Sequence, residues 1–137
     1  MMVLIIGYVV IALLLAVVVA AASAVYIEHK KLLSVADAAS VAAADSYALG
    51  EVAGGSGTPS AVLKSERVRG VVESYLARDG THSRFDRLAI GDGTGSPESA
   101  TAEVVLKAVA HPPVVGFFMP EGIVVEARST ARARLTR

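Results

Sequence analysis

Three histidines and a few aspartates are the residues of this 137-residue chain best suited to bind a metal. Histidines bind zinc in pairs a few positions apart, so that one turn or one helix face presents both side chains. His29, His82 and His111 stand far from one another, and the chain has no cysteine. We therefore expect no metal centre and no cofactor.

Asp86 and Asp92, with the glycine-rich stretch GDGTG at 91–95, could offer carboxylates to calcium. The same composition is typical of a polar turn between strands, and we favour that interpretation. The chain contains no Gly-x-Ser-x-Gly elbow, and its glycine-rich stretch at 50–60 lacks the Gly-Lys-Ser/Thr of a phosphate-binding loop. We expect no enzymatic activity, because the sequence offers no set of catalytic residues that would support a hydrolase.

The elements that would carry a site are set by an uneven distribution of charge. Residues 1–27 contain no charged side chain, whereas the 13 basic and 13 acidic residues all lie in 28–137. The net charge of zero gives no reason to expect a nucleic-acid partner. The chain is long enough for one small domain behind an apolar N-terminus.

The uncharged segment Val3–Ile27 is long enough to cross a membrane. As a helix it would measure about 37 Å, against a hydrocarbon core of about 30 Å. Tyr26, Lys30 and Lys31 would mark the membrane boundary. The alternative is a cleaved signal peptide, for which 22–24 (Ala-Ser-Ala) fits the cleavage site. The missing basic N-terminal region and the length of the apolar run favour an anchor.

The helix is expected to continue past the boundary through KKLLSVADAASVAAADSYALG and to end at Gly50. Small residues four positions apart on this stretch allow another helix to approach closely. We expect them to form a helix-packing face for partner proteins, while the alternative is that they pack on the protein's own domain. The residues of this face are Ala38, Ala39, Ala42 and Ala43.

The remainder is predicted to be an α+β domain: one helix packed on a three-stranded antiparallel sheet. Glycine and serine at 50–60 indicate a flexible linker between the long helix (1–49) and the domain (61–137). A helix should begin at Thr58-Pro59 and end before Gly80. Period-two alternation predicts strands at 85–90, 101–111 and 122–135. The helix face should consist of Val68, Val71, Val72, Tyr75 and Leu76.

The last strand should bury Ile123, Val125, Ala127, Ser129, Ala131 and Ala133. Arg128, Arg132 and Arg134 would lie on its other side, as a solvated basic face or as a docking patch for an acidic partner. Between the last two strands, Phe117, Phe118 and Met119 stand among prolines. This apolar loop either tucks under the sheet or forms an exposed docking loop.

The N-terminal third resembles the TadE/TadG-like proteins of Tad (Flp-type) pilus systems. In that family the apolar helix runs on into the pattern L-Q-x-A-A-D-A-A-A-L-A-A-A, which KLLSVADAASVAAADS follows closely here. The closing GIVVEARSTARARL also resembles the alternating strand at the end of these proteins. The family commonly has a basic leader, and some members have a glutamate early in the apolar run; this sequence shows neither. The positions that match are Leu32, Ala36, Asp37, Ala38, Ala39, Val41, Ala42, Ala43 and Ala44.

This resemblance implies a pilin-like plan and a structural or assembly role in a bacterial pilus. The partners would be other pilin-like or pilus-assembly proteins, in homo- or hetero-oligomers, together with membrane lipid. The implied location is the cytoplasmic membrane, crossed once, with the domain outside the cytoplasm; incorporation into a surface pilus is compatible with this location. Lys30 and Lys31 alone would favour the opposite orientation. The alternative from another class is a signal-cleaved, secreted binding module.

Overall fold

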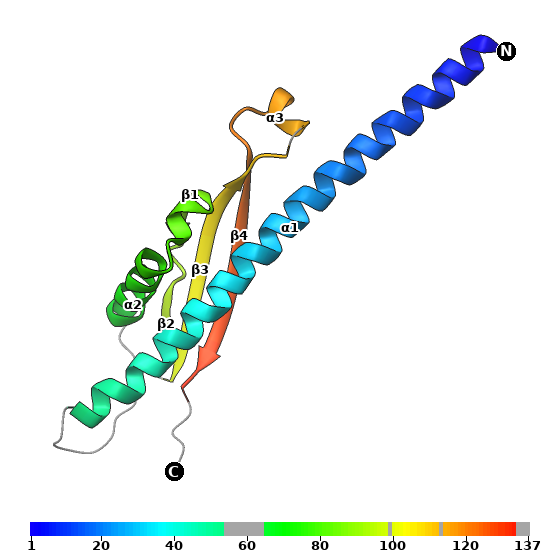
Figure 1. Ribbon diagram of the computed structural model, residues 1–137. Helices are drawn as coiled ribbons and strands as arrows, with labels where there is room; N and C mark the ends of the chain where they lie inside the picture. The colour runs from blue at the N-terminus through cyan, green and yellow to red at the C-terminus, as the bar shows by residue number, and fades with distance from the viewer. Residues whose placement is uncertain (54–64, 99, 113, 134–137) are drawn as a thin grey trace.

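The computed structural model describes residues 1–53, 65–98, 100–112 and 114–133 (Figure 1). Its architecture is a long helix that carries a second helix and a four-stranded antiparallel sheet, which confirms the α+β class. The elements are α1 (Met2–Ala53), α2 (Ser65–Arg78), the 3-10 turn η1 (Thr81–Ser83), β1 (Asp86–Ile90), β2 (Gly95–Glu98), β3 (Thr101–Ala110), α3 (Val115–Phe118) and β4 (Ile123–Arg132).

Helix α1 runs without a break for 52 residues, or about 78 Å. Its sequence holds no proline and is rich in alanine, leucine and valine. The helix passes through Gly50, where we expected it to end, because an interior glycine costs only about 1 kcal/mol relative to alanine. Part of the predicted linker is therefore helical. Residues 54–60, with the expected Thr58-Pro59 helix start, lie outside the described residues.

Strand β3 is the centre of the sheet. Strand β4 pairs with it along its whole length, from Thr101↔Arg132 to Ala110↔Ile123. Strands β1 and β2 pair with β3 as well, at 106–109 and 101–103 respectively, so they lie end to end along its other edge. The sheet has four strands rather than the three expected.

Strand β2 was missed because its sequence, Gly-Ser-Pro-Glu, has no apolar alternation. It is an edge strand, where proline is tolerated since one side makes no ladder bonds. The strand is also held by α2, because the backbone N–H of Ser96 donates to Ser65 Oγ at 3.1 Å. Between β1 and β2, Thr94 Oγ1 bonds both the N–H (3.0 Å) and the carbonyl (3.1 Å) of Val105 and so replaces the interrupted ladder.

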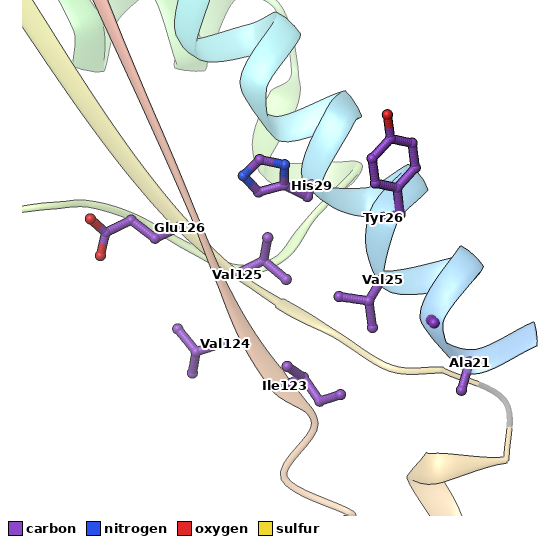
Figure 2. Close-up of a pocket in the computed structure, with 9 residues that line it drawn as sticks. Ala21, Val25, Tyr26, His29, Ile123, Val124, Val125 and Glu126 are labelled. Carbon is purple, nitrogen blue, oxygen red and sulfur yellow. The ribbon is translucent and has the colours of Figure 1, made fainter. Parts of the chain in front are cut away.

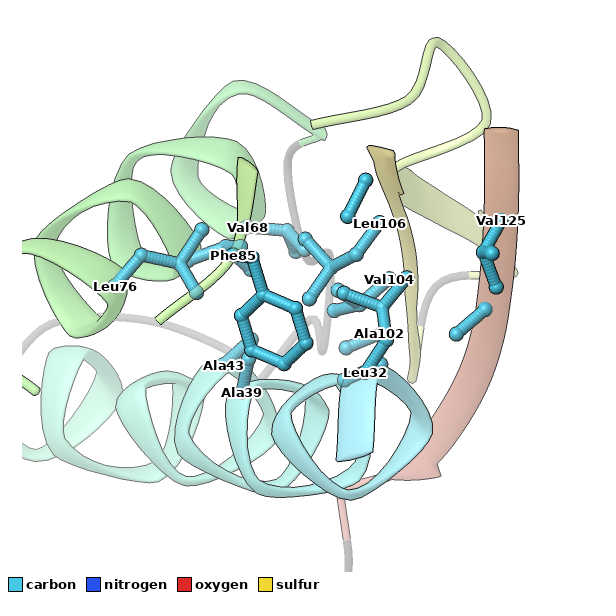
Figure 3. Packing of buried hydrophobic residues seen from close by; sticks show 14 of the residues in the cluster. Leu32, Ala39, Ala43, Val68, Leu76, Phe85, Ala102, Val104, Leu106 and Val125 are labelled. Carbon is cyan, nitrogen blue, oxygen red and sulfur yellow. The ribbon is translucent and has the colours of Figure 1, made fainter. Parts of the chain in front are cut away.

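The hydrophobic core lies between the two helices and one face of the sheet (Figure 3). Residues 102, 104, 106 and 108 of β3 face it, as do Val125 and Ala127 of β4, so the predicted alternation is confirmed. From α2 the core receives Val68, Val72 and Leu76, with Val71 and Tyr75 half-buried beside them. The second half of α1 completes it with Leu32, Ala36, Ala39, Ala43 and Ala44.

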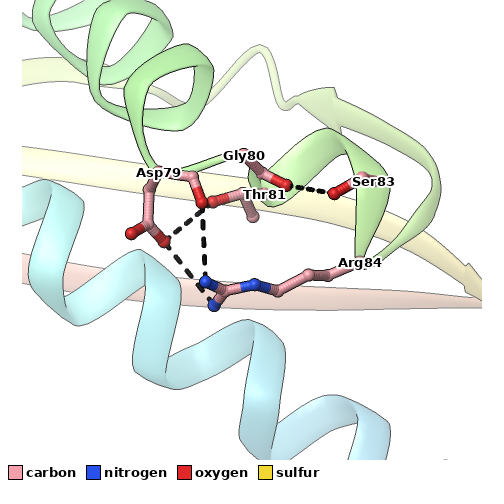
Figure 4. Close-up of polar contacts among 5 residues, drawn as sticks. All are labelled: Asp79, Gly80, Thr81, Ser83 and Arg84. Carbon is pink, nitrogen blue, oxygen red and sulfur yellow. Dashed lines mark hydrogen bonds and ion pairs between the residues drawn. The ribbon is translucent and has the colours of Figure 1, made fainter.

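A short polar turn joins α2 to β1 (Figure 4). Gly80 adopts the left-handed conformation, with φ at 63°, and ends the helix as predicted. Its carbonyl accepts a hydrogen bond from Ser83 Oγ at 2.6 Å, and Arg84 Nη1 lies 3.6 Å from Asp79 Oδ2. These contacts reverse the chain between α2 and β1, which then pairs antiparallel with β3.

Candidate interaction surfaces

The first part of α1 is exposed along its length. Every residue from 2 to 20 is exposed except the half-buried Val17, and large apolar side chains such as Leu14 (61% exposed) point away from the protein. Exposed apolar area costs about 25 cal/mol per Å² in water. By length and composition this is a helix that could cross a membrane.

The second part of α1 belongs to the folded domain. Ala39 and Ala43 are fully buried, while Ala38 and Ala42 are half-buried at the edge of the contact. The small side chains let α1 approach the sheet and α2 closely. This corrects the expectation that all four alanines face a partner's helix, because Ala39 and Ala43 already pack inside their own domain.

A polar link joins α1 to β4 on one side of this contact. Ser129 Oγ donates a hydrogen bond to Asp37 Oδ1 and lies 3.3 Å from Ser40 Oγ. Ser40 Oγ in turn lies 2.8 Å from the Asp37 carbonyl, to which it donates. The sequence carried a signal for this link, since Ser129 is the one polar residue among the inward positions of β4. The pairing with Asp37 has no such signal, because the two residues lie 92 positions apart in the sequence.

The predicted membrane-boundary residues lie on the surface of α1, about one and a half to three turns beyond the apolar stretch of residues 2–20. Tyr26 is exposed, and Lys30 Nζ lies 5.5 Å from the centre of its ring. Lys31 is exposed one position further on. Tyr26 also lines an open, mostly apolar groove of about 590 Å³, formed by 21, 22, 25, 26 and 29 of α1 and 123–126 of β4 (Figure 2).

The residues considered for metal binding are spread over the molecule. His29 lines the groove of Figure 2, and His111 Nδ1 lies 3.5 Å from Asp86 Oδ2 at the adjacent end of the sheet. Asp92 is exposed in the turn between β1 and β2, and His82 is exposed in η1. Within the described ranges, no three His, Asp or Glu side chains are grouped so as to hold a metal ion.

Both basic residues of β4, Arg128 and Arg132, are exposed, as expected. Arg128 Nε lies 3.2 Å from Glu103 Oε1, and on the same face Lys107 Nζ lies 3.7 Å from Glu126 Oε2. Arg132 is exposed, and Arg134 lies outside the described residues. Because Arg128 is paired within the sheet, the basic face is smaller than its sequence suggested.

The apolar loop between β3 and β4 is exposed, which decides between the two alternatives. Phe117 is 89% exposed and Phe118 81%, and Met119 is 51% exposed. Phe117 and Phe118 end the short helix α3, and their ring centres lie 6.1 Å apart in an edge-to-face arrangement. The loop does not tuck under the sheet, and its aromatic tip is free to contact another surface.

Residues 1–46 match the family model described as putative Flp pilus-assembly TadE/G-like, which confirms the resemblance over the N-terminal helix. No curated protein and no solved structure matches the chain. The family match indicates a pilus-associated role and favours a structural rather than an enzymatic protein.

Proposed function

We propose that this protein is a membrane-anchored structural or assembly component of a Tad-type (Flp) pilus. One observation carries the proposal: a single unbroken helix is exposed and uncharged over its first twenty residues, then forms part of a domain core. The family match ends at residue 46 and so spans both parts. The region shared with pilus proteins is thus the region that joins anchor to domain.

The mechanism we propose is mechanical. Since α1 is continuous from Met2 to Ala53, no hinge separates the membrane segment from the buried Leu32–Ala44 stretch. A displacement of the anchor is therefore passed directly to the domain. Of the predicted helix-packing face, only the half-buried Ala38 and Ala42 would remain available to other pilin-like helices. Ala42 borders an open groove between α1 and α2 that also contains Gly70 and Tyr75.

We place the domain outside the cytoplasm, with the protein crossing the membrane once. Tyr26, Lys30 and Lys31 would then lie near the outer lipid surface, where aromatic rings and lysine side chains reach the headgroups. The two lysines work against this orientation, but Glu28 adjoins them and a bias of two residues is small. The role of the family in building an external fibre supports the outside placement.

Fractionation of the full-length protein tests the anchor. We expect it to stay with membranes after alkaline extraction, at the full mass of the chain. Recovery in the soluble fraction, with a mass that lacks residues up to Ala24, would instead support the secreted module. The fold is compatible with that cleavage, since the core residues of α1 begin at Leu32.

Labelling of a single cysteine tests the orientation. The chain has no cysteine, so Arg132→Cys gives one exposed thiol on the domain. An outside domain reacts with a membrane-impermeant maleimide in intact spheroplasts. A reaction that needs membrane lysis would place the domain inside and overturn the pilus proposal.

A further inference from the structure

The exposed tip between β3 and β4 lies at the end of the domain that faces the N-terminal part of α1 (Figure 1). Strand β3 ends there at Ala110, and β4 begins there at Ile123. The residues of α1 nearest this end are Ala24 and Glu28, which line a small pocket with residues 110–112, and Ala21, which lines the groove of Figure 2 with Ile123. The tip therefore projects along α1 toward its exposed, uncharged part.

The level of the lipid surface follows from the charges around this end of the domain. Residues 2–20 of α1 would span about 28 Å as a helix, close to the roughly 30 Å of a hydrocarbon core. About two turns beyond residue 20, Glu28 lines a small pocket together with His111, and His111 Nδ1 lies 3.5 Å from Asp86 Oδ2. These groups are too polar for hydrocarbon. The hydrocarbon boundary thus falls near Ala20–Ala24, about two to three turns of α1 below Lys31 and level with the tip.

We propose that the tip of Val114, Phe117, Phe118 and Met119 inserts shallowly into the same bilayer that α1 crosses. This inference rests on the membrane anchor of the proposed function. Aromatic side chains favour the headgroup region, and the tip sequence from Val114 to Pro120 carries no charge. Val124 at the start of β4, which is 69% exposed, extends the apolar surface on the side of the groove in Figure 2.

Glu121 limits the depth of insertion. It is exposed directly after Pro120, and its carboxylate must remain among headgroups or water. The tip is therefore a second, peripheral contact beside the transmembrane segment. With α1 it fixes how far the domain tilts and rotates on the membrane, because two contacts constrain a rigid body more than one.

Single tryptophans provide a direct test, because the chain contains none. Three full-length variants are compared in vesicles of phosphatidylethanolamine and phosphatidylglycerol: Phe117→Trp at the tip, Leu14→Trp in the anchor, and Arg132→Trp at the opposite end of β4. The vesicles contain lipids brominated either near the headgroup or near the end of the acyl chain, and bromine quenches a tryptophan only on close approach.

We expect Phe117→Trp to lose the larger part of its emission to shallow bromine and little to deep bromine. Leu14→Trp should be quenched by deep bromine, and Arg132→Trp by neither. Unquenched Phe117→Trp beside quenched Leu14→Trp would overturn the tip proposal and leave the anchor standing, so that the tip would have to serve a protein partner or a second copy. If Leu14→Trp is also unquenched, the anchor itself fails, and the proposed function with it.

Discussion

The two parts of α1 have the same backbone but opposite surroundings. Residues 2–20 carry leucine, isoleucine and valine outward, whereas the buried stretch Leu32–Ala44 turns alanines toward the sheet. Large apolar side chains suit lipid, which has no shape to fit, and small ones suit close packing against a fixed surface. The two parts of α1 therefore differ in the size of their apolar side chains as well as in charge, and the large side chains belong to the exposed part.

The largest effect is expected on the strand that packs against the buried part of α1. Ala127 is 1% exposed, so Ala127→Glu places a charge in the core and should lower the free energy of unfolding by about 3 kcal/mol or more. Arg132→Glu, on the exposed side of β4, should change it by less than about 0.5 kcal/mol. Ala131→Glu, at a half-buried position, should fall between them. Equal shifts of the thermal midpoint in a common detergent would mean that the register of β4 is wrong.

A matched pair of alanine substitutions compares the two parts of α1 directly. Ala39→Leu overfills a fully buried position and should destabilise the domain by about 1–3 kcal/mol. Ala16→Leu, at an exposed position, should leave the unfolding free energy of the domain unchanged. Denaturant titration of both variants measures the difference. If Ala39→Leu unfolds like the unmodified protein, the buried half of α1 is not part of the core.

The polar link between Asp37 and Ser129 sharpens the comparison, since it joins only the second part of α1 to β4. A double-mutant cycle with Asp37→Ala and Ser129→Ala should give a coupling energy of about 1 kcal/mol. Asp37→Asn, which keeps an acceptor oxygen, should retain part of it. Strictly additive single mutants would contradict the hydrogen bond.

The smallest effect has the opposite sign and concerns α2, the helix beside the buried part of α1. A β-carbon at Gly70 would meet nothing within 4 Å among the described residues outside its own helix turn, so Gly70→Ala should stabilise the protein by about 0.5–1 kcal/mol. Gly122→Ala is the contrasting change, because φ is +77° and its β-carbon would lie 2.5 Å from Val109 Cγ1. A rise in thermal midpoint for Gly122→Ala would contradict the turn that leads into β4.

The fold class and the main elements could be predicted from the sequence because they follow from periodicity. The alternation along β4 and the apolar face of α2 each predict which side faces the core, and the structure agrees, although only the central residues Val125 and Ala127 of β4 are buried and the other inward positions are half-buried. Strand β2 could not be predicted, because backbone pairing and the Ser65 hydroxyl hold it rather than a pattern of its own side chains. The helix end predicted at Gly50 was wrong, because a glycine ends a helix only where the residues after it also leave the helical conformation. Here α1 continues to Ala53.

The interaction surfaces were harder to predict than the fold. Alanines four positions apart indicate close packing, but the same signal serves a partner's helix and the protein's own sheet. Only the positions of α2, β3 and β4 together show that Ala39 and Ala43 are used internally. Likewise, the composition of Phe117–Met119 gives an apolar loop, but its exposure depends on where β3 ends relative to α1.

The central claim is that one continuous helix anchors the protein in the membrane with its first part and packs into the domain core with its second. Two pairs of arginine substitutions test this claim most directly. Leu14→Arg with Val18→Arg changes exposed positions, and Leu32→Arg with Ala36→Arg changes buried ones at the same spacing. Each full-length variant is measured for retention in membranes after alkaline extraction and for the cooperative unfolding of its domain. The first pair should release the protein from membranes, at roughly 2.5–3.5 kcal/mol per arginine, and leave the domain folded. The second pair should abolish cooperative unfolding but not retention. Loss of both properties in either variant would contradict the division of α1 into an anchor and a core.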